Sequence, residues 1–275
     1  MTALAPLTLE SPPVRHYLMC PPTHYTVKYQ INPWMHPEQP TDADLAMEQW
    51  ENLRRTYLEL GHTVDLIEPL PDYPDMVYAA NGATVVDGVA YGARFTYPQR
   101  QGEAPAYLAR LAELGFTPVE ATEINEGEGD MLVTSRAILA GTGFRSTVAA
   151  HQELQEAVGR AVVSLRLVDP SYYHLDTALA VIDDDLVAYY PPAFSPGSRA
   201  ALEHLFPDAI IATDADAKVL GLNAVSDGTH VVVAPGAHDL ADALRARGYE
   251  PVPVDTSELL KGGGGAKCCT LELRR

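Results

Sequence analysis

A phrase of helix, glycine and strand recurs along the chain, and this recurrence restricts the possible folds more than any other feature. In residues 41–69, apolar residues repeat at steps of three and four up to Gly61, and a strand-like run follows. This pattern predicts an amphipathic helix that ends at the glycine. Residues 104–122 and 239–254 repeat the phrase. A repeated unit of this kind predicts that each copy buries its apolar face against its neighbours.

Hairpins are predicted between these phrases. Asp87–Gly88 and Asp227–Gly228 each stand between two apolar runs, which is typical of a two-residue type I′ turn. A looser version lies around residues 183–185, and a weaker one lies within residues 130–141. Hairpins in nearly every unit distinguish this chain from an open doubly wound sheet, in which single strands alternate with helices.

Two further helices fill the remaining places. Leu154, Val158, Ala161 and Leu165 predict one over residues 154–165, and Ser195–Pro196 begins the other, with proline at a tolerated first-turn position. At the first helix of the chain, Thr41 and Asp44 have the spacing of a capping box.

These elements combine into a ββαβ unit of about 50 to 60 residues, of which about five fit the chain. The first unit starts near residue 15, and residues 268–273 complete the last strand. We expect an α/β fold in which the units form a five-bladed α/β propeller, since a closed ring leaves no exposed sheet edge. Residues 1–275 are expected to form a single domain. No GxGxxG motif follows a strand, so a dinucleotide-binding fold is not indicated.

The composition excludes several classes of partner. The net charge of -18 argues against nucleic acid and anionic membranes, which need clustered lysine and arginine. It is compatible with a small cationic substrate, although acidity is also a common route to solubility. No apolar run approaches the roughly 18 residues of a membrane span. Residues 1–17 lack the pattern of a secretory signal, so we expect a cytoplasmic protein.

The cysteines agree with a reducing compartment. There are three, Cys20, Cys268 and Cys269, and an odd count with two adjacent is a poor disulfide framework. No CxxC pair exists, so a structural zinc site is not expected.

The C-terminal stretch 262–275 combines four glycines with Lys267, Cys268 and Cys269. Consecutive glycines let the backbone approach a ligand closely, and a cation beside a thiol favours the thiolate. The stretch lacks the GxxxxGK[ST] pattern of a phosphate-binding loop. The alternative interpretation is a flexible tail that carries two buried cysteines.

Polar residues open the otherwise apolar hairpins, and equivalent positions of a ring converge on its axis. These residues are Asp75 and Asn81, then Glu126, Glu128 and Asp130, then His174 and Asp176, then Asn223, and finally Cys268. A cysteine, a histidine and a carboxylate supply a nucleophile, a general acid/base and an orienting group. A single histidine such as His174 is also found as an ordinary core residue. The prediction of a catalytic site therefore depends on several polar residues occupying the same position of the repeat.

Three motifs carry a resemblance to a known family: EGEGD at 126–130, HLDT at 174–177, and the glycine-rich loop with Cys268 two residues before Thr270. In this order they resemble the guanidine-modifying enzymes of the pentein fold, and among these the dimethylarginine dimethylaminohydrolase family. The resemblance implies that Cys268 is the nucleophile, His174 the general acid/base and Glu126 its partner, although Glu128 stays an alternative.

The resemblance also implies a substrate site and a reaction. Asp75 and Asn81 match the positions that hold the guanidinium, although relatives often have an acid at the second. Arg100 and Arg145 match arginines that bind the substrate α-carboxylate, which suits bidentate guanidinium contacts. The implied reaction converts dimethylarginine to citrulline and dimethylamine through a covalent cysteine adduct, without a metal or a cofactor.

Alternatives to this reaction stay open from the sequence. They are arginine deiminase or amidinotransferase activity on the same fold, and a non-catalytic propeller scaffold. The expected partner is a small arginine-like cation, and a homo-oligomer is compatible with the sequence.

Overall fold

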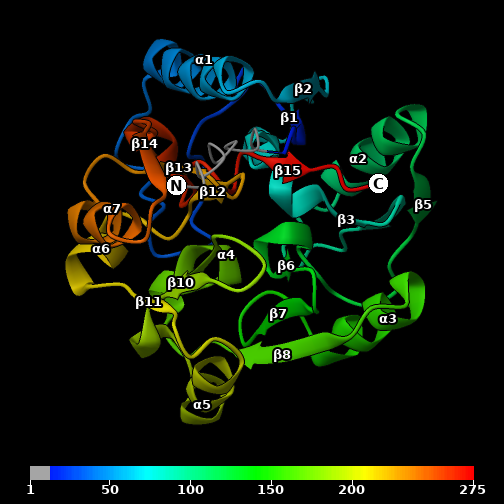
Figure 1. The fold of residues 1–275 in the computed structure, drawn as a ribbon. Helices are drawn as coiled ribbons and strands as arrows, with labels where there is room; N and C mark the ends of the chain where they lie inside the picture. Colours follow the sequence, from blue (N-terminus) through cyan, green and yellow to red (C-terminus); the bar gives the residue numbers. More distant parts are fainter. Residues whose placement is uncertain (1–12) are drawn as a thin grey trace, which may run out of the picture.

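Five small sheets surround a common centre in the computed structural model, which describes residues 13–275 (Figure 1). Each sheet has three strands, and a helix lies on the outer side of the ring beside each sheet (Figure 1). The predicted α/β propeller of five ββαβ units is therefore confirmed. The expectation of no secretory signal falls mainly on residues 1–12, which lie outside the described residues. Among residues 13–275, no helix is both long and apolar enough to cross a membrane.

All five sheets follow one pattern, which the second unit shows clearly. Strand β3 (Ala83–Val86) pairs antiparallel with β4 (Val89–Gly92), and β4 pairs parallel with β5 (Thr117–Val119). Asp87 and Gly88 have φ angles of 48° and 81°, as a type I′ turn requires. The helix α2 (Glu103–Glu113) makes the crossover between the two parallel strands.

The remaining elements repeat this order. Unit one contains β1 (His16–Met19), α1 (Ala43–Glu59), β2 (Thr63–Leu66) and the C-terminal β15 (Leu271–Glu272). Unit three contains β6 (Met131–Val133), β7 (Ile138–Thr142), α3 (Val148–Val158) and β8 (Val162–Arg166). Unit four contains β9 (Leu179–Val181), β10 (Val187–Tyr189), α5 (Pro196–Leu205) and β11 (Ile210–Ile211). Unit five contains β12 (Val225–Ser226), β13 (His230–Val233), α7 (His238–Arg245) and β14 (Glu250–Pro253).

Short helices precede or separate these strands. They are η1 (Pro74–Val77), η2 (Ala79–Gly82), η3 (Gly127–Gly129), η4 (Pro170–Tyr172), α4 (Leu175–Ala178), η5 (Pro191–Ala193), α6 (Asp214–Lys218) and α8 (Ser257–Leu260).

The two ends of the chain close the ring. Strand β15 pairs antiparallel with β1, so the last strand of the chain completes the first sheet. The sequence predicts that residues 268–273 complete the last strand; in the structure only Leu271–Glu272 form a strand, and this strand completes the sheet of unit one.

Each large helix shares an apolar cluster with the sheet of the preceding unit. Trp50, Leu53 and Tyr57 of α1 cluster with Val232 of β13 in unit five. In the same way, Leu154 of α3 clusters with Tyr91 of β4 in unit two. Burial of one such side chain contributes about 2 kcal/mol, so neighbouring units stabilise each other around the whole ring.

Three local predictions need correction. Asp227–Gly228 is not a type I′ turn, because Gly228 has φ of 93° but Asp227 does not have positive φ; the hydrogen bond from Asp227 N to His230 O places Gly228 and Thr229 at the centre of the turn.

Residues 154–165 do not form one helix, because Gly159 ends α3 with φ of 66° and Val162–Arg166 forms β8. This stretch is a further copy of the helix, glycine and strand phrase, in which apolar residues of both elements happen to keep helical spacing. The cap of α1 is Asp42, whose side chain accepts from Leu45 N, rather than Thr41. The structure does show a capping box at α6, between Thr213 and Asp216.

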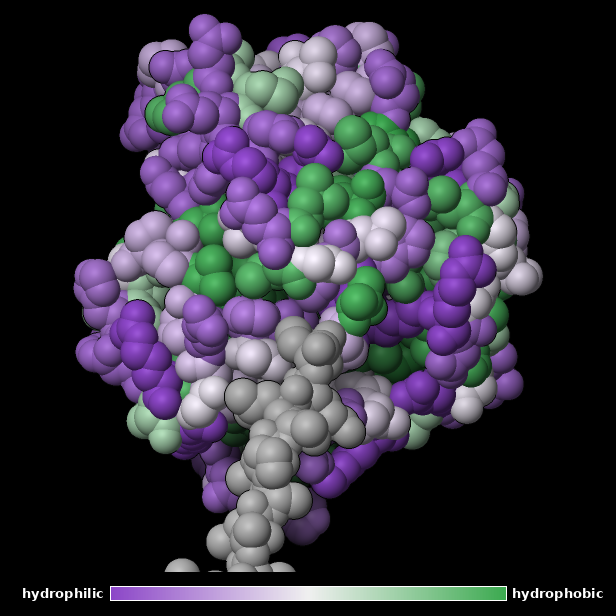
Figure 2. All heavy atoms as spheres, turned by 45° about the horizontal axis from the view of Figure 1, so that its top comes forward, coloured by the Kyte–Doolittle hydropathy of each residue, from purple (hydrophilic) through white to green (hydrophobic). Residues whose placement is uncertain are grey.

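The surface is mostly polar. On the face shown in Figure 2, hydrophilic residues cover much of the area and apolar residues lie among them in several groups. Exposed large apolar side chains belong to separate elements, for example Leu58 of α1, Val148 of α3 and Ile211 of β11. Single exposed apolar residues of this kind are ordinary in soluble folds.

Candidate active site

The central site is formed by the segments that immediately precede the innermost strand of each unit. The turn η2 packs against both η3 and β15, and η3 packs against α4. These contacts bring four units together at the centre of the ring. Because the turns precede apolar strands, their polar side chains are held inside the protein: Asp75, Asn81, Glu126, His174, Asn223 and Cys268 are all buried.

The glycine-rich loop packs too tightly for any side chain. A Cβ atom on Gly264 would lie 2.7 Å from the Tyr78 ring and 2.8 Å from Cβ of Cys268. Gly263 has φ of 94°, a backbone conformation that favours glycine. The Cys268 carbonyl accepts a hydrogen bond of 3.0 Å from Ala80 N, which ties the loop to unit two. The loop is therefore an ordered wall of the site, and the alternative of a flexible tail is wrong.

The sulfur of Cys268 lies between an acid and an amide. It donates to Asp176 Oδ2 at 3.1 Å and accepts from Asn223 Nδ2 at 3.1 Å. Burial and the neighbouring Asp176 carboxylate raise the pKa of Cys268 well above its ordinary value. The free protein therefore holds a protonated thiol at neutral pH, and a bound cation is needed to favour the thiolate.

The imidazole of His174 is fixed by a charged partner. Its Nε2 lies 2.7 Å from Glu126 Oε2, and the same oxygen lies 2.7 Å from Arg145 Nη1. Burial alone would raise the pKa of Glu126, but the Arg145 charge and the His174 hydrogen bond outweigh it and lower the pKa to about 2. Glu126 is therefore ionised at neutral pH and can stabilise an imidazolium.

Two contacts connect His174 to the cysteine loop. The Tyr173 ring packs 4.6 Å from the His174 ring, and its hydroxyl donates to Gly263 O at 2.9 Å. His174 also precedes Asp176, the acid on the sulfur, by two residues. The segment 173–176 thus carries the histidine and an acid to the same wall as Cys268. That the imidazole directly serves the sulfur stays a prediction.

The two glutamates of EGEGD face different partners. Glu126 contacts His174, whereas Glu128 Oε2 lies 2.7 Å from Lys267 Nζ and Glu128 Oε1 pairs with Arg274. Glu126 precedes the 3₁₀ turn η3 and Glu128 lies within it, so the two side chains leave the backbone in different directions. Glu126 thus has the contact expected of a histidine partner. Glu128 instead holds Lys267, the residue that precedes Cys268 in the sequence.

Both predicted carboxylate-binding arginines are buried and held by acids of the chain. Arg100 donates to Glu103 at 2.8 and 2.9 Å and to Asn81 Oδ1 at 2.7 Å. Arg145 donates to Glu126 and to Ile31 O, and its guanidinium lies between the rings of Tyr97 and Tyr173 at 4.6 and 4.5 Å. Their role toward a substrate carboxylate stays a prediction.

The buried Asp75 carboxyl group is hydrogen-bonded to a tyrosine hydroxyl. Its Oδ2 accepts from Tyr29 at 2.9 Å, and burial raises the pKa of this carboxyl. A buried acid with a raised pKa is poised to pair with a cation that enters the site.

Three buried polar atoms near the centre have no hydrogen-bond partner within the described part of the chain. They are Glu126 Oε1, Asp176 Oδ1 and Asn81 Nδ2. Two are acceptors on carboxyl groups, and one is an amide donor. Buried polar groups are rarely left unpaired, so the two carboxyl oxygens point to a ligand with N–H donors, and the amide points to a ligand with an acceptor.

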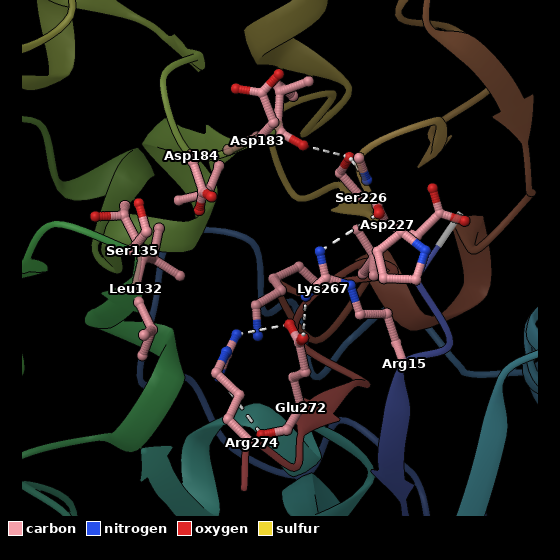
Figure 3. A pocket seen from close by; sticks show the side chains of 18 of the residues that line it. Arg15, Leu132, Ser135, Asp183, Asp184, Ser226, Asp227, Lys267, Glu272 and Arg274 are labelled. Carbon is pink, nitrogen blue, oxygen red and sulfur yellow. Dashed lines mark hydrogen bonds and ion pairs between the residues drawn. The ribbon is translucent and has the colours of Figure 1, made fainter. Parts of the chain in front are cut away.

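A cavity of about 420 Å³ lies at the opposite ends of the same central strands (Figure 3). Those strands are two to four residues long, which places the two ends roughly 10 Å apart. Arg15, Lys267 and Arg274 line this cavity, and each is paired with an acid: Arg15 with Glu272, Lys267 with Glu128, and Arg274 with both. The Lys267 side chain therefore lines this cavity, where Glu128 holds its ammonium group.

No metal site is evident in the part of the chain that the structure describes, where no three His, Cys, Asp or Glu side chains are arranged to hold an ion. Sequence reasoning placed Asp176 and Asn223 at hairpin-opening positions but assigned neither a role. Their equivalence to the other site positions within the repeat was the available signal.

Known proteins resemble this chain in sequence and in structure. The N(G),N(G)-dimethylarginine dimethylaminohydrolase of Mycobacterium tuberculosis is 54% identical over 96% of this chain and 87% of its own length. The bifunctional arginine dihydrolase/ornithine cyclodeaminase ArgZ of a Synechocystis species is 38% identical over 93% of this chain, which spans 37% of that protein. No model of a protein family matches the sequence.

The N-terminal domain of ArgZ also has the same structure. Its substrate-bound cysteine-to-serine variant has a TM-score of 0.91 at 36% identity, covering 95% of this chain and 98% of that domain. Another structure of the domain holds a reaction intermediate covalently. The fold and the buried cysteine site therefore define a guanidine-modifying enzyme of the pentein superfamily. Within that superfamily, the chain belongs to the dimethylarginine dimethylaminohydrolase family.

Proposed function

We infer that this chain hydrolyses Nω-methylated arginine, releasing dimethylamine or methylamine and leaving citrulline. The carrying observation is the Cys268 sulfur held between Asp176 and Asn223, with unpartnered carboxyl oxygens of Asp176 and Glu126 in the same site. A guanidinium supplies N–H donors for those oxygens and the positive charge that favours the thiolate. The 54% identity to the mycobacterial enzyme supports the methylated substrate.

The reaction proceeds through a covalent adduct. The Cys268 thiol transfers its proton to His174, and the resulting thiolate attacks the central guanidinium carbon and forms a C–S bond. The bond from that carbon to the methylated nitrogen then breaks as His174 donates a proton to the departing amine. The product of this half-reaction is an S-alkylthiouronium, which carries the rest of the arginine on the sulfur.

Water completes the cycle. The neutral His174 removes a proton from a water molecule, which attacks the same carbon. The C–S bond breaks, the thiolate is restored and the ureido group of citrulline forms. Ionised Glu126 stabilises the imidazolium in both halves, because its pKa lies at about 2. No step requires a metal or an organic cofactor.

Substrate binding uses the acids and arginines around the centre. Asp75, Asp176 and Glu126 accept the guanidinium N–H groups, and burial makes this neutralisation favourable. Arg145 uses two of its N–H groups on Glu126 and Ile31, which leaves donors for the substrate carboxylate. Arg100 donates a hydrogen bond to Asn81 and so holds the Asn81 amide in place. The three buried, unpaired cysteines suit a reducing compartment, in agreement with a cytoplasmic protein.

Arginine itself is the second candidate substrate. The ArgZ domain, which belongs to an arginine dihydrolase, has a TM-score of 0.91 to this structure. Amidino transfer to an amine and a non-catalytic scaffold are the remaining alternatives.

A product assay separates these candidates. The purified protein is incubated with asymmetric dimethylarginine or with arginine, and dimethylamine, ammonia, citrulline and ornithine are quantified, with Cys268→Ser as the inactive control. We expect dimethylamine and citrulline in equal amounts, with kcat/KM at least about tenfold above that for arginine. Ammonia and ornithine as the main products would assign arginine dihydrolysis instead, and no product from either substrate would support the scaffold.

A further inference from the structure

The side chain of Asn223 holds both the cysteine loop and the sulfur. Asn223 lies just before β12 and is 2% exposed. Its Oδ1 accepts from the main-chain N–H groups of Gly265 at 2.9 Å and Cys268 at 3.0 Å. Its Nδ2 donates to Cys268 Sγ at 3.1 Å and to Asp176 O at 3.2 Å. Two acceptor sites and two donors are thus all in use, which is the full capacity of an amide.

These contacts allow one orientation of the amide. Two main-chain N–H groups point at Oδ1, so a flipped amide would set donor against donor. Nδ2 is therefore directed at the sulfur by the loop itself. The main-chain carbonyl of Asn223 also accepts from Lys267 N at 3.2 Å, which fixes a third position of the loop.

We propose that Asn223 positions Cys268 and donates the hydrogen bond that stabilises its thiolate during catalysis. This inference rests on the proposed function, in which Cys268 is the nucleophile. Burial and the Asp176 and Cys269 side chains raise the pKa of Cys268, whereas the hydrogen bond from Asn223 lowers it.

The roles of Asp176 and Asn223 differ as the reaction begins. Asp176 accepts the S–H of the resting thiol and repels the thiolate. When a guanidinium binds, its N–H groups can take over the Asp176 oxygens, while the Asn223 N–H stays on the sulfur. An amide donor keeps its proton across the working pH range, so this contact is present before and after the thiol ionises.

The decisive variant is Asn223→Asp, which keeps the size and the two acceptor contacts but replaces the donor with an oxygen. We expect kcat to fall about 30-fold or more with KM changed less than about threefold, since the contact acts on the nucleophile. The inactivation rate with 2-chloroacetamidine, which alkylates the thiolate, should have its pH midpoint raised by about one unit or more. The surface variant Gln155→Glu adds the same charge far from the sulfur and should match the parent in both assays.

A second variant protects the test against misfolding. In Asn223→Ser the shorter side chain no longer reaches the sulfur, and no charge is added. This variant should also raise the pH midpoint of inactivation and lower kcat. A parent-like pH profile in whichever variant folds, or a kcat within about threefold of the parent, overturns the role of Asn223. Mass mapping of the alkylated peptide in the parent tests the proposed function separately: label on Cys268 upholds the nucleophile, and label elsewhere refutes it whatever Asn223 does.

Discussion

The Asp176 carboxyl is buried beside the Cys268 thiol, and its ionisation reduces the stability of the free protein. Burial raises the pKa of Asp176 from 3.8 to about 7, although Lys267 and the hydrogen bonds from Cys268 and Asn223 act in the opposite direction. Because the folded protein binds this proton more tightly than the unfolded chain, stability falls as pH rises between the two values. The change Asp176→Asn places a neutral group at the same position, so we expect it to stabilise the protein.

The size of the effect follows from the two pKa values. Each unit of difference corresponds to 1.36 kcal/mol, so a shift from 3.8 to about 7 corresponds to at most about 4 kcal/mol above pH 7. At pH 5 only the part between 3.8 and 5 has developed, which is about 1.6 kcal/mol. The gain from Asp176→Asn should therefore grow by roughly 2 to 3 kcal/mol from pH 5 to pH 8.

Denaturation by urea at pH 5 and pH 8 measures this difference, with the exposed Asp184→Asn as the control that changes charge alone. We expect the control to shift the free energy of unfolding by less than about 0.5 kcal/mol. Turnover by Asp176→Asn should fall about 100-fold or more, because the variant loses a charge that faces the substrate cation. If the gain in stability is equal at the two pH values, or if the variant is less stable at pH 8, burial of an ionised Asp176 is not a cost and the reasoning fails.

Three further changes test other parts of the site. Cys268→Ser should abolish turnover with the fold intact, whereas Cys269→Ser should keep most activity; equal losses in a product assay would contradict the choice of nucleophile. Glu128→Gln leaves the half-buried Lys267 without its acid and Arg274 with Glu272 alone, so it should lower the free energy of unfolding by about 2 kcal/mol, which urea denaturation would measure. In Gly129→Ala the new Cβ would lie 2.4 Å from the amide of the neighbouring asparagine and 3.1 Å from the imidazole, so kcat should fall about tenfold or more. Gly197→Ala, where a Cβ meets nothing within 4 Å, is its matched control, and equal kcat values in the two variants would argue against a tightly packed imidazole.

Local features of the sequence predicted most of the fold. Asp87–Gly88 predicted a turn because type I′ geometry needs positive φ at both positions, and the turn has it. The helix, glycine and strand phrase predicted the outer half of units one, two and five for a similar reason, since Gly61, Gly115 and Gly248 all have positive φ. Repetition of the unit then predicted a ring, because no single unit can bury its own apolar face.

Local features failed where two elements shared one pattern. Residues 154–165 have apolar side chains at helical spacing, yet Gly159 divides them into a helix and a strand. Periodicity over a short window cannot distinguish these cases, because the partner strand β7 that selects the extended form lies some twenty residues earlier in the chain.

The amino-acid sequence alone determined which chemical groups reach the centre. Short-range turn and strand signals set where each unit begins, and the residue at that position is the polar group that the unit contributes. Only the packing of the five units decided how those groups are paired. Glu126 contacts the histidine while Glu128, two residues later, contacts Lys267 and Arg274, and Asn223 rather than a cation lies on the sulfur. The physical reason is that hydrogen bonds and ion pairs depend on ångström distances between residues 40 to 150 positions apart, and those distances exist only once the ring has closed.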